Sequence, residues 1–334
     1  MIIRLAQDGD LPKLLTLSQK VASGMTTVPQ DSEGWNKLIT STKKFISHSK
    51  VEQGSCLLVL EDTSKNRIAG FTAIHRNVGM SRPFFTFKKS KIRKANSVTG
   101  RATDYDILFL TNDFGKADEI GTLFLDPEYQ GYGTGRFLSL SRFLFMAIDP
   151  TRYSGIIFAE MRGYQNGEGI SPVWEALGKH FFDIPFEDAD RYSAGKPVQF
   201  ITDSFPEHPI IVDLLPQAAQ DAIGKPHRDT VPAYKLLKSV GFLDLDYVDI
   251  FDGGPTIFTP IENIKPLRES KRAIAKIGQP ERGTSYMIAL PDITNFTAAS
   301  ANISLQDSEA TINQTVADKL GIKDGDQIIF APLR

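Results

Sequence analysis

The chain has 334 residues, which suggests about two domains. Hydrophobic residues make up 41% of it and charged residues 23%, as in ordinary soluble globular proteins, so intrinsic disorder and collagen-like repeats are excluded. The single cysteine excludes a disulfide framework and a thiolate metal cage, and it is typical of a reducing compartment. The formal net charge of −2 favours neither nucleic acid nor an anionic membrane as a partner.

The densest apolar stretches, 56–60 and 143–148, are much shorter than the about 20 residues that a membrane span needs. The N-terminus has no apolar signal core, so we expect a cytoplasmic protein. The charge is unevenly spread, because residues 63–103 hold ten basic residues and no acidic one. This bias predicts either a polyanionic ligand, such as a nucleotide-containing cofactor, or a solvated basic loop.

Strand and helix patterns alternate in the first half of the chain. Periodicity and turn residues predict strands at 1–6, 55–61, 67–75, 107–111, 121–125 and 155–161, and helices at about 12–21, 31–48 and 131–148. Residues 78–106, which include the basic segment 82–101, are expected to form a loop. The alternation predicts an α/β (α+β) fold with a mixed sheet flanked by helices.

The second half contains a faint internal echo. A short helix that begins with proline leads to an aromatic strand start at Phe181, and the same pattern leads to Phe242. A tandem arrangement of two similar units is therefore an alternative to a single one. A turn at 252–255 and β-prone runs near the C-terminus, with a turn at 323–326, predict further strands. We expect a first α/β domain at 1–165, a second α/β region at 166–278 and a small β-rich C-terminal appendage at 279–334.

A glycine-rich turn follows the predicted strand 121–125. Asp126-Pro127 ends the strand, and Gln130-Gly-Tyr-Gly133-Thr-Gly135 leads into a helix. Glycine lets a ligand approach the backbone, and the first-turn N–H groups have no intrahelical partner. Together with the helix dipole, these groups form an anion site that suits phosphate. The spacing fits neither the Gly-Lys-Ser/Thr of a Walker loop nor the Gly-x-Gly-x-x-Gly of a Rossmann fold.

This loop resembles the Gln/Arg-x-x-Gly-x-Gly pyrophosphate loop of the GNAT acyl-CoA N-acyltransferases. The chain as a whole resembles the arginine N-succinyltransferase family, most specifically in Asp249-Ile-Phe-Asp-Gly-Gly-Pro255. Further matching segments lie at 109–113, 119–127, 141–147, 159–163, 171–174, 177–182, 208–209 and 247–255. The resemblance covers nearly the whole chain and is weakest in the basic segment and after about residue 280.

The resemblance implies transfer of succinyl from succinyl-CoA to the α-amine of L-arginine, the first step of arginine catabolism by the succinyl route. The amine attacks directly, so no covalent intermediate, metal or permanent cofactor is implied, and Cys56 is expected to be a core residue. The implied proton donor to the CoA thiolate is His227, and Leu125 is the implied position at succinyl-CoA. The implied acyl-CoA loop consists of Gln130, Gly131, Gly133 and Gly135.

Arginine as a substrate needs a carboxylate for its guanidinium and a donor for its α-carboxylate. Candidates for the guanidinium, all in matching segments, are Asp113, Glu119, Glu160 and Asp249. Arg162 is the candidate for the α-carboxylate. Each of these residues can instead be a surface charge or a cap. For the succinyl carboxylate, the candidates are Arg142 and the basic segment.

Two departures from the family pattern leave the substrates open. The phosphate loop is closer to the general GNAT form, and the segment 82–101 is richer in lysine. Ornithine is therefore a competing acceptor, and another acyl-CoA is a competing donor. The resemblance also implies a homo-oligomer or a hetero-oligomer of two similar chains, so a partner subunit without activity of its own is a further alternative. Nucleic-acid binding through the basic segment is disfavoured by the net charge.

Overall fold

The computed structural model describes residues 1–21, 25, 27–47, 53–186, 188–189, 204–205, 208–281 and 284–334. The strands are β1 (Ile2–Leu5), β2 (Gly54–Asp62), β3 (Arg67–Arg76), β4 (Thr86–Ala95), β5 (Ala102–Thr111), β6 (Asp118–Leu125), β7 (Ile156–Glu160), β8 (Ile210–Ile211), β9 (Leu243–Val248), β10 (Pro255–Pro260), β11 (Lys271–Ile277), β12 (Ser285–Ala289), β13 (Thr297–Asn302), β14 (Ser304–Gln306), β15 (Glu309–Ile312) and β16 (Gln327–Pro332). The helices are α1 (Leu11–Ser18), α2 (Ser32–Ser47), α3 (Thr134–Ile148), α4 (Lys179–Phe182), α7 (Gln217–Ala222), α8 (Val231–Ser239), α9 (Lys265–Arg268) and α10 (Gln314–Leu320).

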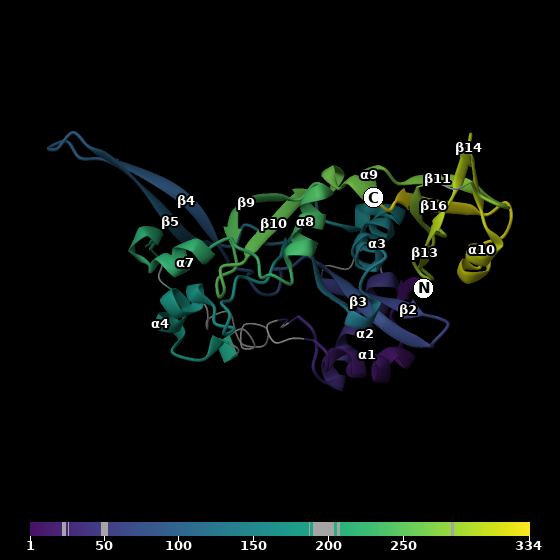
Figure 1. Cartoon of the computed structure of the whole chain (residues 1–334), viewed down its shortest axis with the longest axis horizontal. Coiled ribbons are helices and arrows are strands. Elements are labelled where there is room, and N and C mark those ends of the chain that lie inside the picture. Colours follow the sequence, from purple (N-terminus) through teal and green to yellow (C-terminus); the bar gives the residue numbers. More distant parts are fainter. Residues whose placement is uncertain are drawn as a thin grey trace.

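These strands pair into one mixed sheet, in the order β14-β15-β11-β16-β12-β13-β1-β2-β3-β6-β7-β10-β9-β4-β5-β8. Parallel pairing occurs between β6 and β7 and between β11 and β15. Helices flank the sheet, so the predicted fold class is confirmed (Figure 1). Within the described residues, no helix combines the length and the apolar composition needed to cross a bilayer.

The central strands β2 and β3 are buried on both faces, because successive side chains of a strand point to opposite faces of the sheet. Leu58 and Leu60 pack with α3 in one hydrophobic cluster, whereas Leu57 and Val59 pack with α1 and α2 in another. Cys56 lies on β2 and is fully buried, and burial raises the pKa of its thiol. This residue is therefore a core residue, as the sequence predicted.

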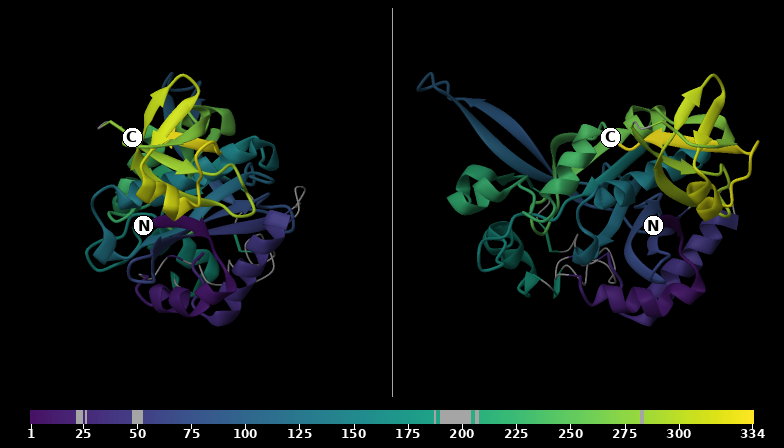
Figure 2. Two further views of the ribbon diagram at one scale, coloured as in Figure 1. Left: turned by 90° about the vertical axis from the view of Figure 1, so that its right-hand side faces the viewer. Right: turned by 45° about the vertical axis from the view of Figure 1, so that its right-hand side comes forward.

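The expectation of a loop at 78–106 is wrong, because these residues contain β4 and the first half of β5. The two strands pair along their whole length and project from the body as a long hairpin (Figures 1 and 2). Basic side chains on β4 face carboxylates on β5, as in the 2.6 Å ion pair of Lys91 with Asp106. Towards its tip the hairpin is exposed on both faces, so its sequence has no apolar alternation that would predict strands.

The predicted strand start at Phe181 is also wrong. Residues Trp174–Gly178 form a π-helical turn that continues into α4, and Phe181 lies inside that helix. Phe242, in contrast, directly precedes β9 as expected. The two segments that share the proline-helix pattern therefore continue into different structures.

The C-terminal strands β11 to β16 and α10 enclose their own hydrophobic cluster. This unit lies at the end of the molecule opposite the hairpin (Figure 1). It joins the rest of the sheet where β13 pairs with β1, at Ile3↔Ala298. The C-terminal residues are rich in strands, and β16 follows the predicted turn at 323–326, but the unit also includes β11, which precedes residue 279. The division of the chain at 165 and 278 stays a prediction.

Candidate functional site

The parallel strands β6 and β7 separate along their length. They pair only at Asp118↔Ile157 and Glu119↔Phe158, after which β6 continues along β3 and β7 continues along β10. Beyond these pairs, the facing edges of the two strands carry backbone N–H and C=O groups that have no strand partner among the described residues. An extended ligand can hydrogen-bond to such edges as an added strand does.

A β-bulge lies in β6 where the two strands part. The pairing of β6 with β3 shifts register here, and Thr122 has a φ of 50°, which is rare for a β-branched residue. The Thr122 hydroxyl lies 3.0 Å from His75 Nε2, and His75 Nδ1 lies 2.8 Å from Ser55 Oγ. Burial lowers the pKa of His75 to about 4, so the ring is neutral at physiological pH. This chain of hydrogen bonds holds the strained backbone in place.

The glycine-rich loop between β6 and α3 has open space in front of its backbone. Gly131 and Gly133 have φ values of 98° and 80°, in the left-handed region that glycine adopts without strain. A Cβ atom at either position would meet no atom within 4 Å, and one at Gly135 would meet only the Leu125 side chain, at 3.6 Å. Gln130 is exposed at the start of the loop. The predicted loop residues and Leu125 therefore lie together at the end of β6.

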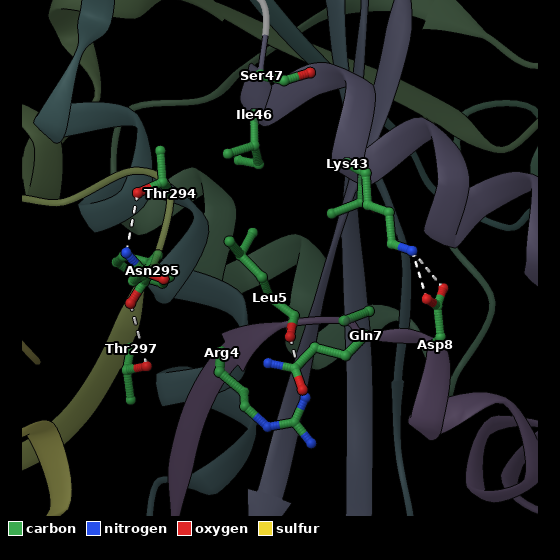
Figure 3. Close-up of a pocket in the computed structure, with 13 residues that line it drawn as sticks. Arg4, Leu5, Gln7, Asp8, Lys43, Ile46, Ser47, Thr294, Asn295 and Thr297 are labelled. Atoms are coloured by element: carbon green, nitrogen blue, oxygen red, sulfur yellow. Dashed lines mark hydrogen bonds and ion pairs between the residues drawn. The ribbon is translucent and has the colours of Figure 1, made fainter.

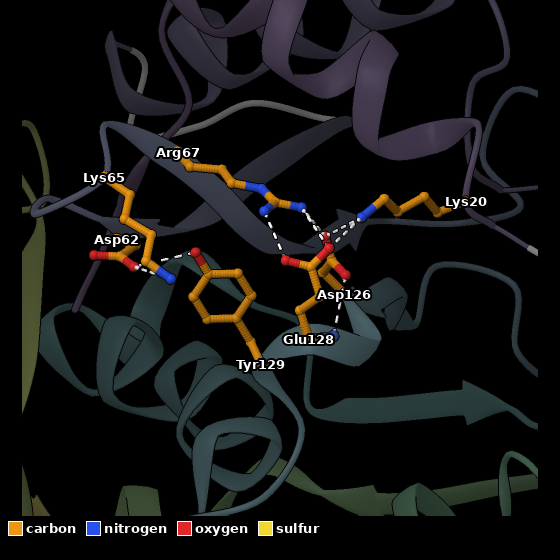
Figure 4. A network of polar contacts seen from close by, with 7 residues as sticks. All are labelled: Lys20, Asp62, Lys65, Arg67, Asp126, Glu128 and Tyr129. Carbon is orange, nitrogen blue, oxygen red and sulfur yellow. Dashed lines mark hydrogen bonds and ion pairs between the residues drawn. The ribbon is translucent and has the colours of Figure 1, made fainter.

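An ion-pair network fixes the start of this loop (Figure 4). The carboxylate of Asp126 is buried and accepts from Lys20 Nζ at 2.8 Å and from Arg67 Nη2 at 2.6 Å. Both cations also contact Glu128, and the Glu128 N–H donates to Asp126. Burial alone would raise the pKa of Asp126, but these donors and charges outweigh it and lower the pKa. Every charge of this network has a partner, so its role is to hold the loop.

A cavity of about 430 Å³ opens at the other end of β6. Three of the predicted substrate residues line it together: Glu119 from β6, Glu160 from the end of β7, and Asp249 from the turn after β9. His75, Arg76 and Arg82 line the same cavity. The fold thus brings together carboxylates that are far apart in the sequence.

The carboxylates of this cavity are poorly solvated. Burial raises the pKa of Glu119 to about 7 and also raises that of Asp249. Gly121 makes room for the first of these, because a Cβ there would lie 2.9 Å from Glu119 Oε1. Buried carboxyl groups of this kind bind a cation or exchange a proton near neutral pH.

The segment 249–255 anchors the cavity to the end of β7. Asp249 Oδ1 accepts from two backbone N–H groups, including that of Asp252 at 2.8 Å. The Asp252 carboxylate accepts from the backbone N–H groups of Gly163 at 2.6 Å and of Gly254 at 2.8 Å. A Cβ at Gly254 would lie 2.0 Å from the Met161 carbonyl oxygen, so only glycine fits there. This packing explains the order of aspartates and glycines in the segment.

His227 lies between α7 and α8, beside the chain that leaves β7, and is 8% exposed. Its backbone N–H donates to the carbonyl oxygen of Arg162 at 2.7 Å. Nδ1 accepts from the Asp229 N–H at 3.2 Å and lies 3.6 Å from the Asp229 carboxylate. Burial and the charge of Arg162 lower the pKa of His227, so its imidazolium is a stronger acid than that of free histidine. The Arg162 guanidinium donates to Gln165 Oε1 at 2.7 Å.

Three candidate substrate residues, Asp113, Arg142 and Arg162, are not among the residues that line the cavity that contains Glu119. Asp113 is exposed after β5 and accepts a hydrogen bond from the Tyr247 hydroxyl at 2.7 Å. The hydroxyl of Thr111 and that of Tyr247 lower the pKa of Asp113. Arg142 is buried inside α3, where its guanidinium donates to the backbone and hydroxyl of Ser139.

A larger cavity, of about 650 Å³, lies between β1, α2 and the loop before β13 (Figure 3). Its charged groups are already paired within the protein. Lys43 Nζ contacts both oxygens of Asp8, and Arg4 forms ion pairs with Asp10 at 2.7 Å and with Glu61 at 2.5 Å. Size alone does not make this cavity the better site, because each charged residue described in its lining already has a partner in the protein.

Several groups of the site could not be identified from the sequence. His75, Thr122 and Arg76 have ordinary surroundings there, and Arg82 is a candidate for the succinyl carboxylate only as one residue of the segment 82–101. Arg76 and Arg82 both lie within residues 63–103, where acidic residues are lacking. This pattern does not distinguish the two arginines from the basic residues of the hairpin. Only the pairing of β3 with β6 brings His75 opposite Glu119.

Comparisons with known proteins point to one family. A family model described as arginine N-succinyltransferase beta subunit matches residues 1–266. The arginine N-succinyltransferase of Photorhabdus laumondii is 36% identical over 100% of this chain and 98% of its own, and that of Yersinia enterocolitica is 36% identical over 99% of each. The solved structure of arginine/ornithine succinyltransferase subunit AI from Pseudomonas aeruginosa matches with a TM-score of 0.90 and 27% identity, over 100% of this chain and 98% of that one.

Proposed function

The chain belongs to the arginine N-succinyltransferase family, and from this premise we propose that it transfers succinyl from succinyl-CoA to the α-amine of L-arginine. The observation that carries the proposal is the parting of β6 and β7 between a glycine-rich loop and an acidic cavity. The loop suits the pyrophosphate of CoA, and the cavity suits a cationic acceptor. An extended pantetheine arm fits between these two places, along the free strand edges.

The acceptor pairs its guanidinium with the carboxylates of Glu160 and Asp249. Both line the cavity, and desolvated carboxylates bind guanidinium groups strongly. Glu119 accepts the proton that the α-ammonium group must lose before attack. Its pKa of about 7 suits proton transfer at neutral pH, because such a carboxylate is partly ionised and still basic enough.

The deprotonated amine attacks the thioester carbonyl, so that a C–N bond forms and the C–S bond breaks with its electron pair leaving on sulfur. Backbone N–H groups on the free edge of β6 near the bulge polarise the carbonyl oxygen as an oxyanion hole does. Leu125 and the loop residues Gln130, Gly131, Gly133 and Gly135 hold the acyl-CoA. Its thioester supplies the activated acyl group, so acyl-CoA is a co-substrate and not a resident cofactor.

His227 donates a proton to the departing CoA thiolate. Its imidazolium is more acidic than usual, and the Asp229 carboxylate 3.6 Å from Nδ1 stabilises the cation before transfer. Arg162 is held beside His227 through its carbonyl oxygen, and we assign its guanidinium to the acceptor's α-carboxylate. Asp113 is the weakest of the four carboxylate candidates, because the other three line the cavity and Asp113 does not.

The test is thiol release by the purified full chain, with succinyl-CoA or acetyl-CoA as donor and L-arginine, L-ornithine or no acceptor. Release that needs both succinyl-CoA and arginine supports the proposal. His227→Ala should then lower kcat by about 10²–10⁴-fold. The matched control is His180→Ala, because His180 is exposed on α4. Release with acetyl-CoA alone would contradict the assignment of the donor.

Ornithine is the second candidate acceptor. The Pseudomonas aeruginosa relative is described as an arginine/ornithine succinyltransferase subunit, which makes this alternative specific. Ornithine carries an ammonium group in place of the guanidinium and cannot form a bidentate pair with a carboxylate. A kcat/KM for ornithine equal to that for arginine would show that Glu160 and Asp249 do not discriminate between the two.

We also propose that the chain acts as an oligomer, either of identical chains or with a similar chain. The matching family model is described as a subunit. The β4–β5 hairpin is two-stranded over most of its length, and isolated hairpins are marginally stable in water. Its tip exposes Val98 by 92% and Ile92 by 37%. If the hairpin binds another subunit, Ile92→Asp with Val98→Asp lowers the mass measured by light scattering; an unchanged mass contradicts this role.

A further inference from the structure

Two arginine side chains in the Glu119 cavity have buried N–H groups without partners. Arg76 is the last residue of β3, and Arg82 lies in the connection from β3 to β4. Arg76 Nε and Arg82 Nη2 are shielded from solvent and donate to no acceptor. Within the part of the chain that the structure describes, neither guanidinium forms an ion pair with a carboxylate. A buried N–H without a partner is rare in proteins and needs an explanation.

The acidic residues of the same cavity do not neutralise these arginines. Glu119, Glu160 and Asp249 line it with Arg76 and Arg82, yet no ion pair joins the two sets. Burial raises the pKa of the nearby Asp118 although the charge of Arg76 acts in the opposite direction, and the Asp118 oxygens already accept from two backbone N–H groups. The cavity therefore separates positive from negative groups, which suits a ligand that carries charges of both signs.

Arg82 has the clearest need for a ligand. Burial lowers the pKa of its guanidinium, and no carboxylate contributes in the opposite direction. A guanidinium presents a planar fork of donors that matches a carboxylate in a bidentate pair. Arg82 also lies within the connection that leads into the basic hairpin, so its position depends on the fold and not on the local sequence.

We infer that Arg82, with Arg76 beside it in the cavity wall, forms a subsite that binds a substrate carboxylate. This inference rests on the proposed function, in which two carboxylates enter the reaction. One is the terminal carboxylate of the succinyl group, and the other is the α-carboxylate of arginine. A guanidinium recognises both carboxylates in the same way. Substrates that lack one carboxylate or the other distinguish the two possibilities.

The experiment measures kcat/KM of the full chain and of Arg82→Met with four substrate pairs. The donors are succinyl-CoA and butyryl-CoA, which has a methyl group in place of the terminal carboxylate. The acceptors are arginine and agmatine, which lacks the α-carboxylate. Arg82→Lys retains the positive charge and should retain part of the preference. The matched control is Arg101→Met, because Arg101 is an exposed arginine of the same basic region near the hairpin tip.

Each preference is the ratio of the kcat/KM values for the two donors or for the two acceptors. We expect Arg82→Met to lower one of these ratios by about 100-fold and to leave the other unchanged. Loss of the preference for succinyl-CoA over butyryl-CoA assigns the subsite to the donor. Loss of the preference for arginine over agmatine assigns it to the acceptor. Equal losses with all four pairs would indicate a structural role and overturn the inference, as would two unchanged preferences.

A binding measurement separates this inference from the proposed reaction. If the unmodified chain releases no thiol with any pair, the proposed function fails, whereas the subsite can still be tested with succinate alone. Succinate should raise the Tm of the unmodified chain and of Arg101→Met but not that of Arg82→Met. Equal shifts in all three proteins would overturn the subsite.

Discussion

The two ends of β6 carry two charged clusters that differ in how completely their charges are paired. At the C-terminal end, Asp126 and Glu128 are matched by Lys20 and Arg67 (Figure 4). At the N-terminal end, Glu119 faces a cavity whose cationic groups stay separate from its carboxylates. A cluster that satisfies itself stabilises the fold, whereas buried N–H groups without acceptors, such as Arg76 Nε and Arg82 Nη2, are prepared for a ligand. Completeness of pairing therefore distinguishes structural from functional charges on one strand.

The largest difference in activity between two variants should appear when one carboxylate is removed from each cluster in turn. Glu119→Gln should lower kcat by about 10²–10⁴-fold, because the variant cannot accept the proton of the amine. Glu128→Gln should leave kcat/KM within about twofold, since Glu128 lies in an exposed pair of the other cluster and solvent screens its charge. Steady-state thiol release measures both variants. Equal losses of activity would remove the distinction between the clusters.

The pH dependence should have opposite signs in the two clusters. Glu119 has a folded-state pKa of about 7, above its unfolded value of 4.5, so its contribution to stability falls as the pH rises between these values. Arg67 and Lys20 lower the pKa of Glu128, so its contribution is present above pH 4.5 and is lost on acidification. Urea unfolding at pH 4 and pH 8 should show Glu119→Gln gaining stability relative to the unmodified chain only at pH 8.

In the unmodified protein, kcat/KM should rise with pH through about 7 as Glu119 ionises. The Glu119→Gln variant should lose this rise in kcat/KM but keep any pH dependence that comes from His227. A profile for Glu119→Gln that keeps the same inflection would assign the titration to another group.

Asp126→Asn should lower stability more than activity. The buried carboxylate accepts charge-assisted hydrogen bonds from Lys20 and Arg67, and such bonds contribute about 1.5–3 kcal/mol each. We expect a loss of about 2 kcal/mol in the free energy of unfolding, measured with urea. Succinyl-CoA saturation should still restore most of the turnover. Stability unchanged within error would contradict a structural role for this cluster.

The smallest expected effect concerns the loop between the clusters. Gly133→Ala places a side chain in the left-handed region, which costs about 1–2 kcal/mol, and intrudes on the space in front of the loop. The KM for succinyl-CoA should rise about tenfold. Gly100→Ala is the control, because Gly100 has a φ of 67° at the hairpin tip and carries the same backbone cost away from the loop. A rise in KM in both variants would mean that backbone strain alone is responsible.

Much of the fold and part of the site could be predicted from the sequence. The strands β2, β3 and β7 and the helices α2 and α3 are close to their predicted ranges, because their apolar periodicity reflects burial. The loop from Gln130 to Gly135 was recognisable because phosphate binding by backbone N–H groups depends on local glycines. The β4–β5 hairpin was not, since strands exposed on both faces lack apolar alternation.

The central strands and the glycine-rich loop could be predicted because each depends on residues close together in the chain, and the family resemblance could be predicted from short motifs along it. Which charged residues meet depends on the packing of distant segments. Glu119, Glu160 and Asp249 share a cavity because β6 and β7 pair in parallel and the turn after β9 folds back to the end of β7, whereas Asp113 stays outside. Arg82 joins them through the same long-range packing. Two charges pair only if they are close in space. For residues far apart in the chain, the fold sets that distance, and their spacing in the sequence does not.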